Sequence, residues 1–270
     1  MKSKAIAFPY VGWMALFVVA PLVIITVYAF TSDAGGFTLA NFQDMAQYTA
    51  AFGRSFLLAA IATVICVLIG YPLAYFLARE TSWVHRMATM LIMLPMWMNF
   101  LLRTYSWKFL LERNGLINTL FGLFGVGPFQ MIDTQGAIVL GMVYNFLPYM
   151  VLPIFSVIEK IDPKVIEAAQ DLGANGRTVF RRIVFPLSLP GVLSGITMVF
   201  IPSVSTFAIS RLLGGSKTLL LGNLIDMQFL GSAYNPHLGS AISLVMMVIV
   251  LVCMAVMNRF GEGEEGVTVL

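Results

Sequence analysis

The sequence predicts an all-α integral membrane protein with six transmembrane helices. Hydrophobic residues make up 59% of the 270 positions and charged residues only 11%, whereas soluble domains carry about 25% charged residues. Six apolar runs have close to the roughly 20 residues that an α-helix needs to cross a hydrocarbon core. No run shows the period-two alternation of a membrane-spanning strand. The composition therefore excludes a water-soluble globule.

The six predicted spans are separated by short loops. The first begins after a basic lead that resembles a signal peptide, but its apolar part is too long and has no small-x-small cleavage site. We therefore interpret it as a retained span. The predicted spans cover residues 8–30, 56–78, 87–107, 136–158, 187–209 and 238–257.

Prolines are frequent within or beside these spans, where a missing backbone donor permits kinks. They are Pro72, Pro95, Pro148, Pro153, Pro190 and Pro202. Residues 111–127 and 219–230 mix apolar residues with Gly, Asn and Asp. Both stretches are too short or too broken to cross, which predicts interfacial or re-entrant segments. The GEGEEG near the end predicts a solvated acidic tail.

The distribution of basic residues predicts that both termini are cytoplasmic. With the termini inside, the 16 Lys and Arg divide ten against six in favour of the inner segments, as the positive-inside rule requires. The loop over residues 159–186 is then cytoplasmic. The inner basic residues are Lys2, Lys4, Arg79, Arg86, Lys160, Lys164, Arg177, Arg181, Arg182 and Arg259, and the outer ones are Arg54, Arg103, Lys108, Arg113, Arg211 and Lys217.

Catalytic and metal-binding chemistry is not predicted. No Asp or Glu lies in the middle of a span, where an ion-coupled transporter would need one. His85 and His237 lie on opposite faces, and Cys66 and Cys253 lie inside apolar runs, so neither pair predicts a metal site or a disulfide. The GGSKT at 214–218 lacks the spacing of a phosphate loop. Arg103 either reaches the interface with its head group or has a functional role; both readings stay open.

The loop over residues 159–186 is a polar segment between two apolar runs. Asp162 and Pro163 predict a helix start, and Gly173 predicts its end. A second helix is predicted from Gly176, with Val179, Ile183 and Val184 on one apolar face, and Pro186 is expected to close it before the fifth span. From the residues alone, two interpretations stay open. The loop either docks another protein through Glu167 and the adjacent alanines, or lies on headgroups with its arginines on anionic lipid.

The spacing of the loop resembles a known signature. Glu167-Ala168-Ala169, three residues, Gly173, nine residues, Ile183, one residue and Phe185-Pro186 is similar to the EAA motif of ATP-binding cassette importer permeases, with Phe185 in place of Leu. The resemblance implies one permease domain over residues 1–270 with the type I importer fold. It also implies that the loop docks on an ATPase subunit through Glu167, Ala168, Ala169, Gly173, Ile183 and Pro186.

Residues 94–118 and 212–229 resemble the polyamine group of these permeases, in particular the first permease subunit of spermidine/putrescine importers. The resemblance implies a bacterial inner-membrane protein that works with a second permease, two ATPase subunits and a solute-binding protein. The ATPase would bind ATP and Mg, and this chain no cofactor. Related permeases for iron, sulfate or other solutes remain the alternative, and no nucleic acid is an expected partner.

A polyamine path would need acceptor oxygens and aromatic faces for its ammonium groups. The predicted path residues are Asn99, Tyr105, Trp107, Tyr144, Asn145, Ser205 and Asp226. Two rival functions are a stand-alone secondary transporter and a membrane enzyme. The first would need intramembrane carboxylates or an inverted repeat, and the second a catalytic cluster; neither feature is visible.

Overall fold

The computed structural model describes residues 3–261, except residues 33, 81, 216–217 and 232. Five helices in this part are long and apolar enough to cross a membrane, and a sixth span results when one bent helix pair is counted together. The prediction of an all-α protein with six spans is confirmed. Lys2, Ser216 and Lys217 of the predictions above, and the acidic tail, lie outside the described residues.

Three predicted spans have nearly the predicted bounds, and the second begins earlier than expected. All six prolines named above lie inside helices. The first span consists of α1 (Ser3–Met14), a π-helical turn (Ala15–Val19) and α2 (Ala20–Ala29). It is connected by α3 (Ala40–Met45) and a 3₁₀ turn (Ala46–Tyr48) to the second span, α4 (Thr49–Leu77). The fourth span is α8 (Gln135–Glu159), and the sixth is α14 (Pro236–Gly261).

The third span is broken, which corrects the single helix expected over residues 87–107. α5 (Ser82–Trp97) is followed by α6 (Phe100–Leu111) after a bend of 91°. Asn99 caps the new helix, since its Oδ1 accepts the backbone N–H groups of Leu101 at 2.9 Å and Leu102 at 3.3 Å. Asparagine is a strong N-cap, so this residue begins a helix where the apolar pattern predicted the interior of one.

The fifth span begins earlier than expected. α10 (Gly176–Val179), a π-helical turn (Phe180–Val184) and α11 (Phe185–Ser205) form one helix of 30 residues. The prediction that Pro186 closes the loop helix is therefore wrong. In the π-helical turn the N–H of Phe185 donates to the carbonyl of Phe180, and this wider turn carries the helix past a proline that has no N–H of its own. The separate helix α12 (Ala208–Leu213) follows.

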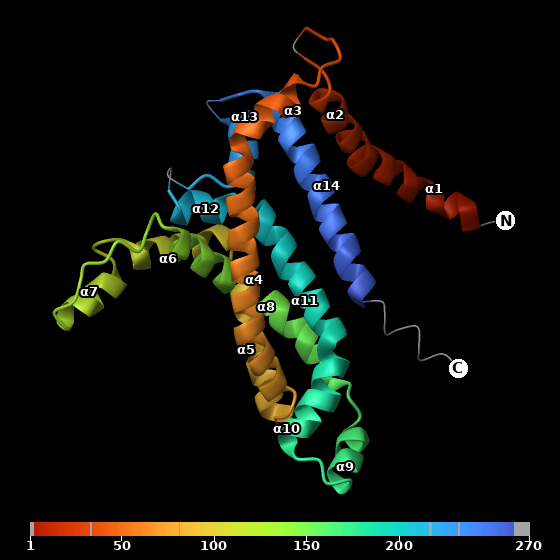
Figure 1. The fold of residues 1–270 in the computed structure, drawn as a ribbon, viewed down its shortest axis with the longest axis vertical. Helices are drawn as coiled ribbons and strands as arrows, with labels where there is room; N and C mark the ends of the chain where they lie inside the picture. The colour runs from red at the N-terminus through yellow and green to blue at the C-terminus, as the bar shows by residue number, and fades with distance from the viewer. Residues whose placement is uncertain (1–2, 33, 81, 216–217, 232, 262–270) are drawn as a thin grey trace.

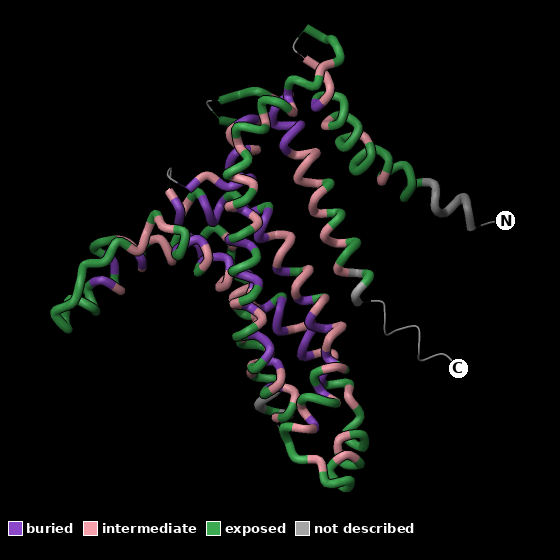
Figure 2. The backbone as a smooth tube through the Cα atoms, viewed as in Figure 1, coloured by how far each residue is buried: buried purple, intermediate pink, exposed green. Residues whose placement is uncertain are grey.

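The core lies where α8 packs between α4 and α11 (Figure 1). Ile138, Met142, Met150 and Ile154 of α8 are fully buried, and Figure 2 shows buried residues gathered along the facing sides of these helices. Glycines bring α11 close to α8: a Cβ built at Gly191 would lie 2.8 Å from the carbonyl oxygen of Pro153.

The first span lies outside this core. None of its apolar window is buried, and α1 extends away from the other helices (Figure 1). α2 rests on α14, where the ring of Tyr28 stacks on His237 at 5.0 Å. An apolar helix with an exposed surface of this kind is stable only against lipid or another subunit.

Two short helices occupy the stretches expected to be interfacial or re-entrant. α7 (Leu116–Leu123) lies at the end of an arm that continues from α6, and α13 (Leu221–Leu230) folds back onto the other helices (Figure 1). The backbone N–H of Leu221 donates to Ser55 Oγ at 2.9 Å, and the Ser210 hydroxyl donates to Asn223. These bonds hold α13 at the end of the molecule opposite residues 159–186.

Candidate functional site

Residues 159–186 form one tip of the molecule (Figure 1). Their first helix is α9 (Pro163–Asp171). Asp162 Oδ1 accepts the backbone N–H of Lys164 at 2.9 Å, and Pro163 occupies the first helical position. The predicted cap is confirmed, and it fixes where the helix begins.

Gly173 ends α9 with the geometry of a Schellman motif. Its φ is +82°, a conformation that costs an L-residue with a side chain free energy. The N–H of Gly173 donates to the carbonyl of Gln170 at 2.8 Å, and the N–H of Ala174 donates to that of Ala169 at 3.0 Å. These two bonds satisfy carbonyls at the helix end and turn the chain toward α10.

The motif residues on α9 face outward. Glu167 and Ala168 are exposed, and Ala169 is half-buried against the core. The Glu167 carboxylate has no ion pair within the described part of the chain, so it is free to accept a charge-assisted hydrogen bond from another protein. Leu172, which the sequence analysis did not single out, is 90% exposed. A leucine this exposed at a polar tip adds an apolar contact to the surface.

A groove of about 480 Å³ lies between α9 and the beginning of α10. One wall of the groove is α10, and Asn175 fixes where this helix begins, because its Oδ1 accepts the N–H of Thr178 at 2.9 Å and caps the helix. Pro186 lies outside the groove, half-buried in the continuous helix. The groove is lined by Ala169, Leu172, Gly173, Ala174, Asn175, Thr178, Val179, Arg182 and Ile183.

Some predicted path residues lie on α6 and on the part of α8 that it contacts. The rings of Trp107 and Tyr144 meet edge to face with centroids 5.4 Å apart, and Asn145 follows Tyr144 on α8. Asn145 is buried, donates to the Gly141 carbonyl at 2.8 Å, and has no partner for its Oδ1. Tyr105 is exposed on α6. Asn99 is exposed too, but its carbonyl is occupied by the helix cap described above.

The other two predicted path residues lie where α11 and α13 meet. Asp226 forms an ion pair with Arg211, with Nη1 and Oδ2 3.2 Å apart, so an ammonium group would compete with a cation of the same chain. Ser205 is exposed, and its hydroxyl donates to the carbonyl of Ile201 at 3.2 Å. α13 approaches closely here, since a Cβ at Gly222 would lie 2.6 Å from the Ser205 carbonyl oxygen.

Arg103 is buried, with 7% of its surface exposed. Its Nε and Nη1 have no hydrogen-bond partner in the described structure. The interpretation that its head group reaches the interface is wrong for this conformation, because α6 turns at Asn99 and packs against α12 and α8. A buried guanidinium without hydrogen-bond partners is costly, and the functional role considered for Arg103 stays a prediction.

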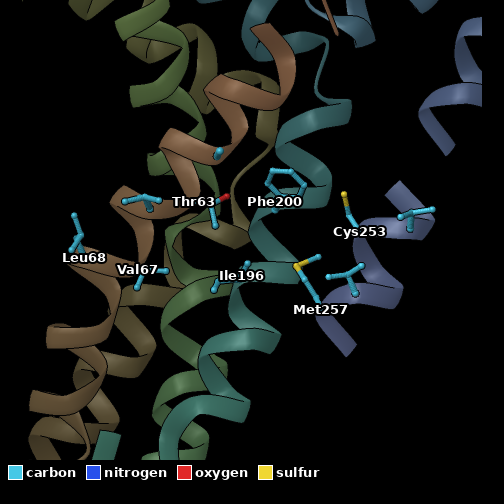
Figure 3. Close-up of a pocket in the computed structure, with 11 residues that line it drawn as sticks. Thr63, Val67, Leu68, Ile196, Phe200, Cys253 and Met257 are labelled. Carbon is cyan, nitrogen blue, oxygen red and sulfur yellow. The ribbon is translucent and has the colours of Figure 1, made fainter. Parts of the chain in front are cut away.

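The apolar groove between α4, α11 and α14 has a volume of about 580 Å³. Figure 3 shows the side chains of these helices around it, among them Thr63, Phe200, Cys253 and Met257. The Thr63 hydroxyl donates to the Ala59 carbonyl at 2.7 Å, and apart from this hydroxyl and the sulfur atoms of Cys253 and Met257 the lining side chains are hydrocarbon. Within the described residues there is also no group of three or more His, Cys, Asp or Glu placed to hold a metal ion.

Comparison with known proteins identifies the family. A family model described as "Binding-protein-dependent transport system inner membrane component" matches residues 70–262. The chain belongs to this family. The matched region includes α9, α10 and the core helices α8 and α11. The chain is therefore the membrane component of a transport system that also uses a binding protein, which removes the membrane enzyme and the stand-alone transporter left open above.

Relatives and solved structures agree with this family. The chain is 36% identical over 258 residues to the spermidine/putrescine transport system permease protein PotB of Haemophilus influenzae, covering 92% of this chain and 90% of that protein. It is 38% identical over 249 residues to PotB of Escherichia coli K12, covering 88% and 90%. A bacterial ABC transporter that imports alginate contains a chain with a TM-score of 0.84 at 16% identity, covering 98% and 96%. The predicted fold of an ABC importer permease is confirmed.

Proposed function

We propose that this chain is one of the two membrane-spanning subunits of an ATP-driven importer, with residues 159–186 docked in the cytoplasm on a separate ATPase. The observation that carries the proposal is the surface of α9. Glu167 and Ala168 are exposed at the tip, and the Glu167 carboxylate has no ion pair within the described chain. A carboxylate beside small residues fits a close protein contact that supplies an Arg or Lys.

The continuous helix Gly176–Ser205 is the element that would transmit the motion. It begins next to α9, and its α11 part packs against α8 in the core. When ATP closes a dimer of ATPase subunits, a force on α9 would reach the membrane through this helix without passing through a flexible linker. Rigid helices that shift between two packings are a common means of alternating access. ATP and Mg would be bound by the ATPase, and this chain would hold no cofactor.

A polyamine such as spermidine or putrescine is the substrate that the relatives support. Both PotB proteins are named as spermidine/putrescine permeases and align with most of this chain. The edge-to-face pair of Trp107 and Tyr144 and the unpaired Oδ1 of Asn145 supply the aromatic faces and carbonyl oxygen that an ammonium group needs. The binding protein would deliver the substrate, and a second permease would complete the path.

The test is ATP-dependent uptake by the complex reconstituted in liposomes. Labelled spermidine should be taken up when ATP is on the ATPase side, and unlabelled spermidine and putrescine should compete where sulfate does not. Glu167→Lys should abolish binding-protein-stimulated ATP hydrolysis and uptake, because it places a cation where we expect a cation to bind. Asp171→Lys, which makes the same change of charge at another exposed position of α9, is the matched control.

Two results would contradict different parts of the proposal. Unchanged uptake by the Glu167→Lys complex would remove the docking role of the loop. Failure of polyamines to compete, with uptake of another solute intact, would remove the substrate and leave the importer in place.

A further inference from the structure

Three arginines form a cluster at the base of the continuous helix. Arg177, Arg181 and Arg182 are all exposed, and together with Thr178 they line a hollow of about 420 Å³. None of the three has an ion-pair partner within the described chain. Like charges near one another repel, so an anion from outside the chain would stabilise the cluster.

The position of the cluster along the helix indicates which anion this is. Phe185 and Leu187, the next exposed residues, are apolar and have 43% and 47% of their surface exposed. At about 1.5 Å per helical residue, Phe185 lies roughly 4 to 12 Å and Leu187 roughly 8 to 15 Å along the helix from the backbones of the three arginines. Exposed cations directly below exposed apolar side chains match the boundary between phospholipid headgroups and acyl chains.

The cluster is also distinct from the docking surface on α9. α9 presents Glu167, Ala168 and Leu172, and its exposed carboxylate suits a basic partner. The arginines suit an acidic one and belong to the continuous helix, which forms one wall of the groove described above; Arg182 lines both the groove and the hollow. One loop therefore has two surfaces of different chemistry, and only the arginine surface continues into the apolar face of a span.

We propose that Arg177, Arg181 and Arg182 bind the phosphate of an anionic phospholipid, with Phe185 and Leu187 against its acyl chains. Planar guanidinium groups donate paired hydrogen bonds to phosphate oxygens. The inference rests on the proposed function for placing this loop in the cytoplasmic leaflet. Its consequence is that lipid charge fixes the base of the helix that transmits motion from the ATPase, so anionic lipid raises the coupling of hydrolysis to transport.

The test uses the whole complex in nanodiscs of phosphatidylcholine alone or mixed with phosphatidylglycerol, a small part of which carries a photoreactive headgroup. After illumination, cross-links are mapped by peptide mass spectrometry, and binding-protein-stimulated ATP hydrolysis is measured in parallel. The variants are the triple exchanges of all three arginines to Gln and to Lys. The matched control is Arg79→Gln with Arg86→Gln, which removes two exposed cations outside the cluster.

The wild-type complex should cross-link within residues 176–187 and hydrolyse ATP faster in the anionic discs. The Gln variant should lose that cross-link, by about fivefold for each arginine removed, while the Lys variant retains part of it and the control retains it fully. Soluble glycerol phosphate should not replace the lipid. Equal cross-linking of the Gln variant and the wild type, or activation by glycerol phosphate in phosphatidylcholine discs, would overturn the proposal.

A protein partner would give a different result. If the arginines contact the ATPase, the Gln variant should lose the ATPase subunits during purification whatever the lipid, and this result also overturns the proposal. Failure of the proposed function is separable, because a permease that binds no ATPase would still show arginine-dependent cross-linking to phosphatidylglycerol.

Discussion

At the scale of single residues, the backbone of Gly173 shapes the proposed docking surface. Its φ of +82° allows the two hydrogen bonds that end α9, and nothing lies within 4 Å of the position its Cβ would take. The positive φ of this residue, rather than a lack of space for a side chain, is therefore the reason that glycine is required there. Gly176 has equally open surroundings but lies in α10 with an ordinary helical backbone. Substitutions at the two glycines therefore separate the effect of backbone conformation from that of an added side chain.

Gly173→Ala should destabilise the end of α9 by about 1 kcal/mol, because a side chain disfavours the left-handed conformation. Gly173→Asn should be milder, since Asn tolerates this region better. Binding-protein-stimulated ATP hydrolysis by the reconstituted complex should fall in the order wild type, Asn, Ala, whereas Gly176→Ala should have no effect. Equal losses at both glycines would show that the backbone of Gly173 has no special role.

The structural role of a single residue could be predicted from the sequence where that role depends on neighbouring residues alone. The cap of Asp162 and the stop at Gly173 depend only on neighbours along the chain, and both are present. The ion pair of Asp226 with Arg211 and the burial of Arg103 depend on how distant helices pack. No local pattern contains that information, so the sequence predicts Asp226 as a path residue without indicating its ion-pair partner. The roles of all the predicted docking and path residues remain predictions.

At the scale of elements, the contact between α8 and α11 depends on glycine for a different reason. A Cβ on Gly191 would lie 2.8 Å from the carbonyl oxygen of Pro153 and 3.1 Å from the Cα of Ile154. Both are backbone atoms that cannot move without shifting α8. The hydrogen on Gly191 is therefore what allows these two helices to pack closely, as small residues do in other membrane helix pairs.

Gly191→Ala should lower the free energy of unfolding by about 1–3 kcal/mol, because the added methyl group overpacks this contact. Ser194→Ala, at an exposed position of the same helix, is the control and should leave it nearly unchanged. Thermal unfolding of the purified permease in detergent measures both. A melting temperature of the Gly191 variant equal to that of the control would mean that the helices are further apart than described here.

Element boundaries followed from the sequence where hydrophobicity alone determines them. α8 and α14 have nearly the predicted ends. The third and fifth spans do not, because hydropathy records which residues are apolar and carries no information on backbone direction. Met98 and Asn99 interrupt an apolar run without ending it, and the π-helical turn before Pro186 carries a helix past a residue that normally stops one.

At the scale of the whole molecule, the proposed function requires that the tip carrying α9 and the end carrying α13 lie on opposite sides of the membrane. They lie at opposite ends of the bundle (Figure 1), and the positive-inside bias predicts that α9 is cytoplasmic. Gln170 on α9 and Tyr234 before α14 are exposed, the tyrosine by 70%. Their cysteine variants report the two ends separately.

In a background with Cys66 and Cys253 replaced by Ala, a membrane-impermeant maleimide should label Tyr234→Cys in spheroplasts and leave Gln170→Cys unlabelled. Inverted membrane vesicles should show the reverse, because the exposed thiols then face the other compartment. Detergent-solubilised protein, in which both should react, controls for accessibility. Labelling of Gln170→Cys from outside the cell would place α9 away from any cytoplasmic ATPase, and the docking role of Glu167 and the coupling of α9 to the fifth span would fall with it.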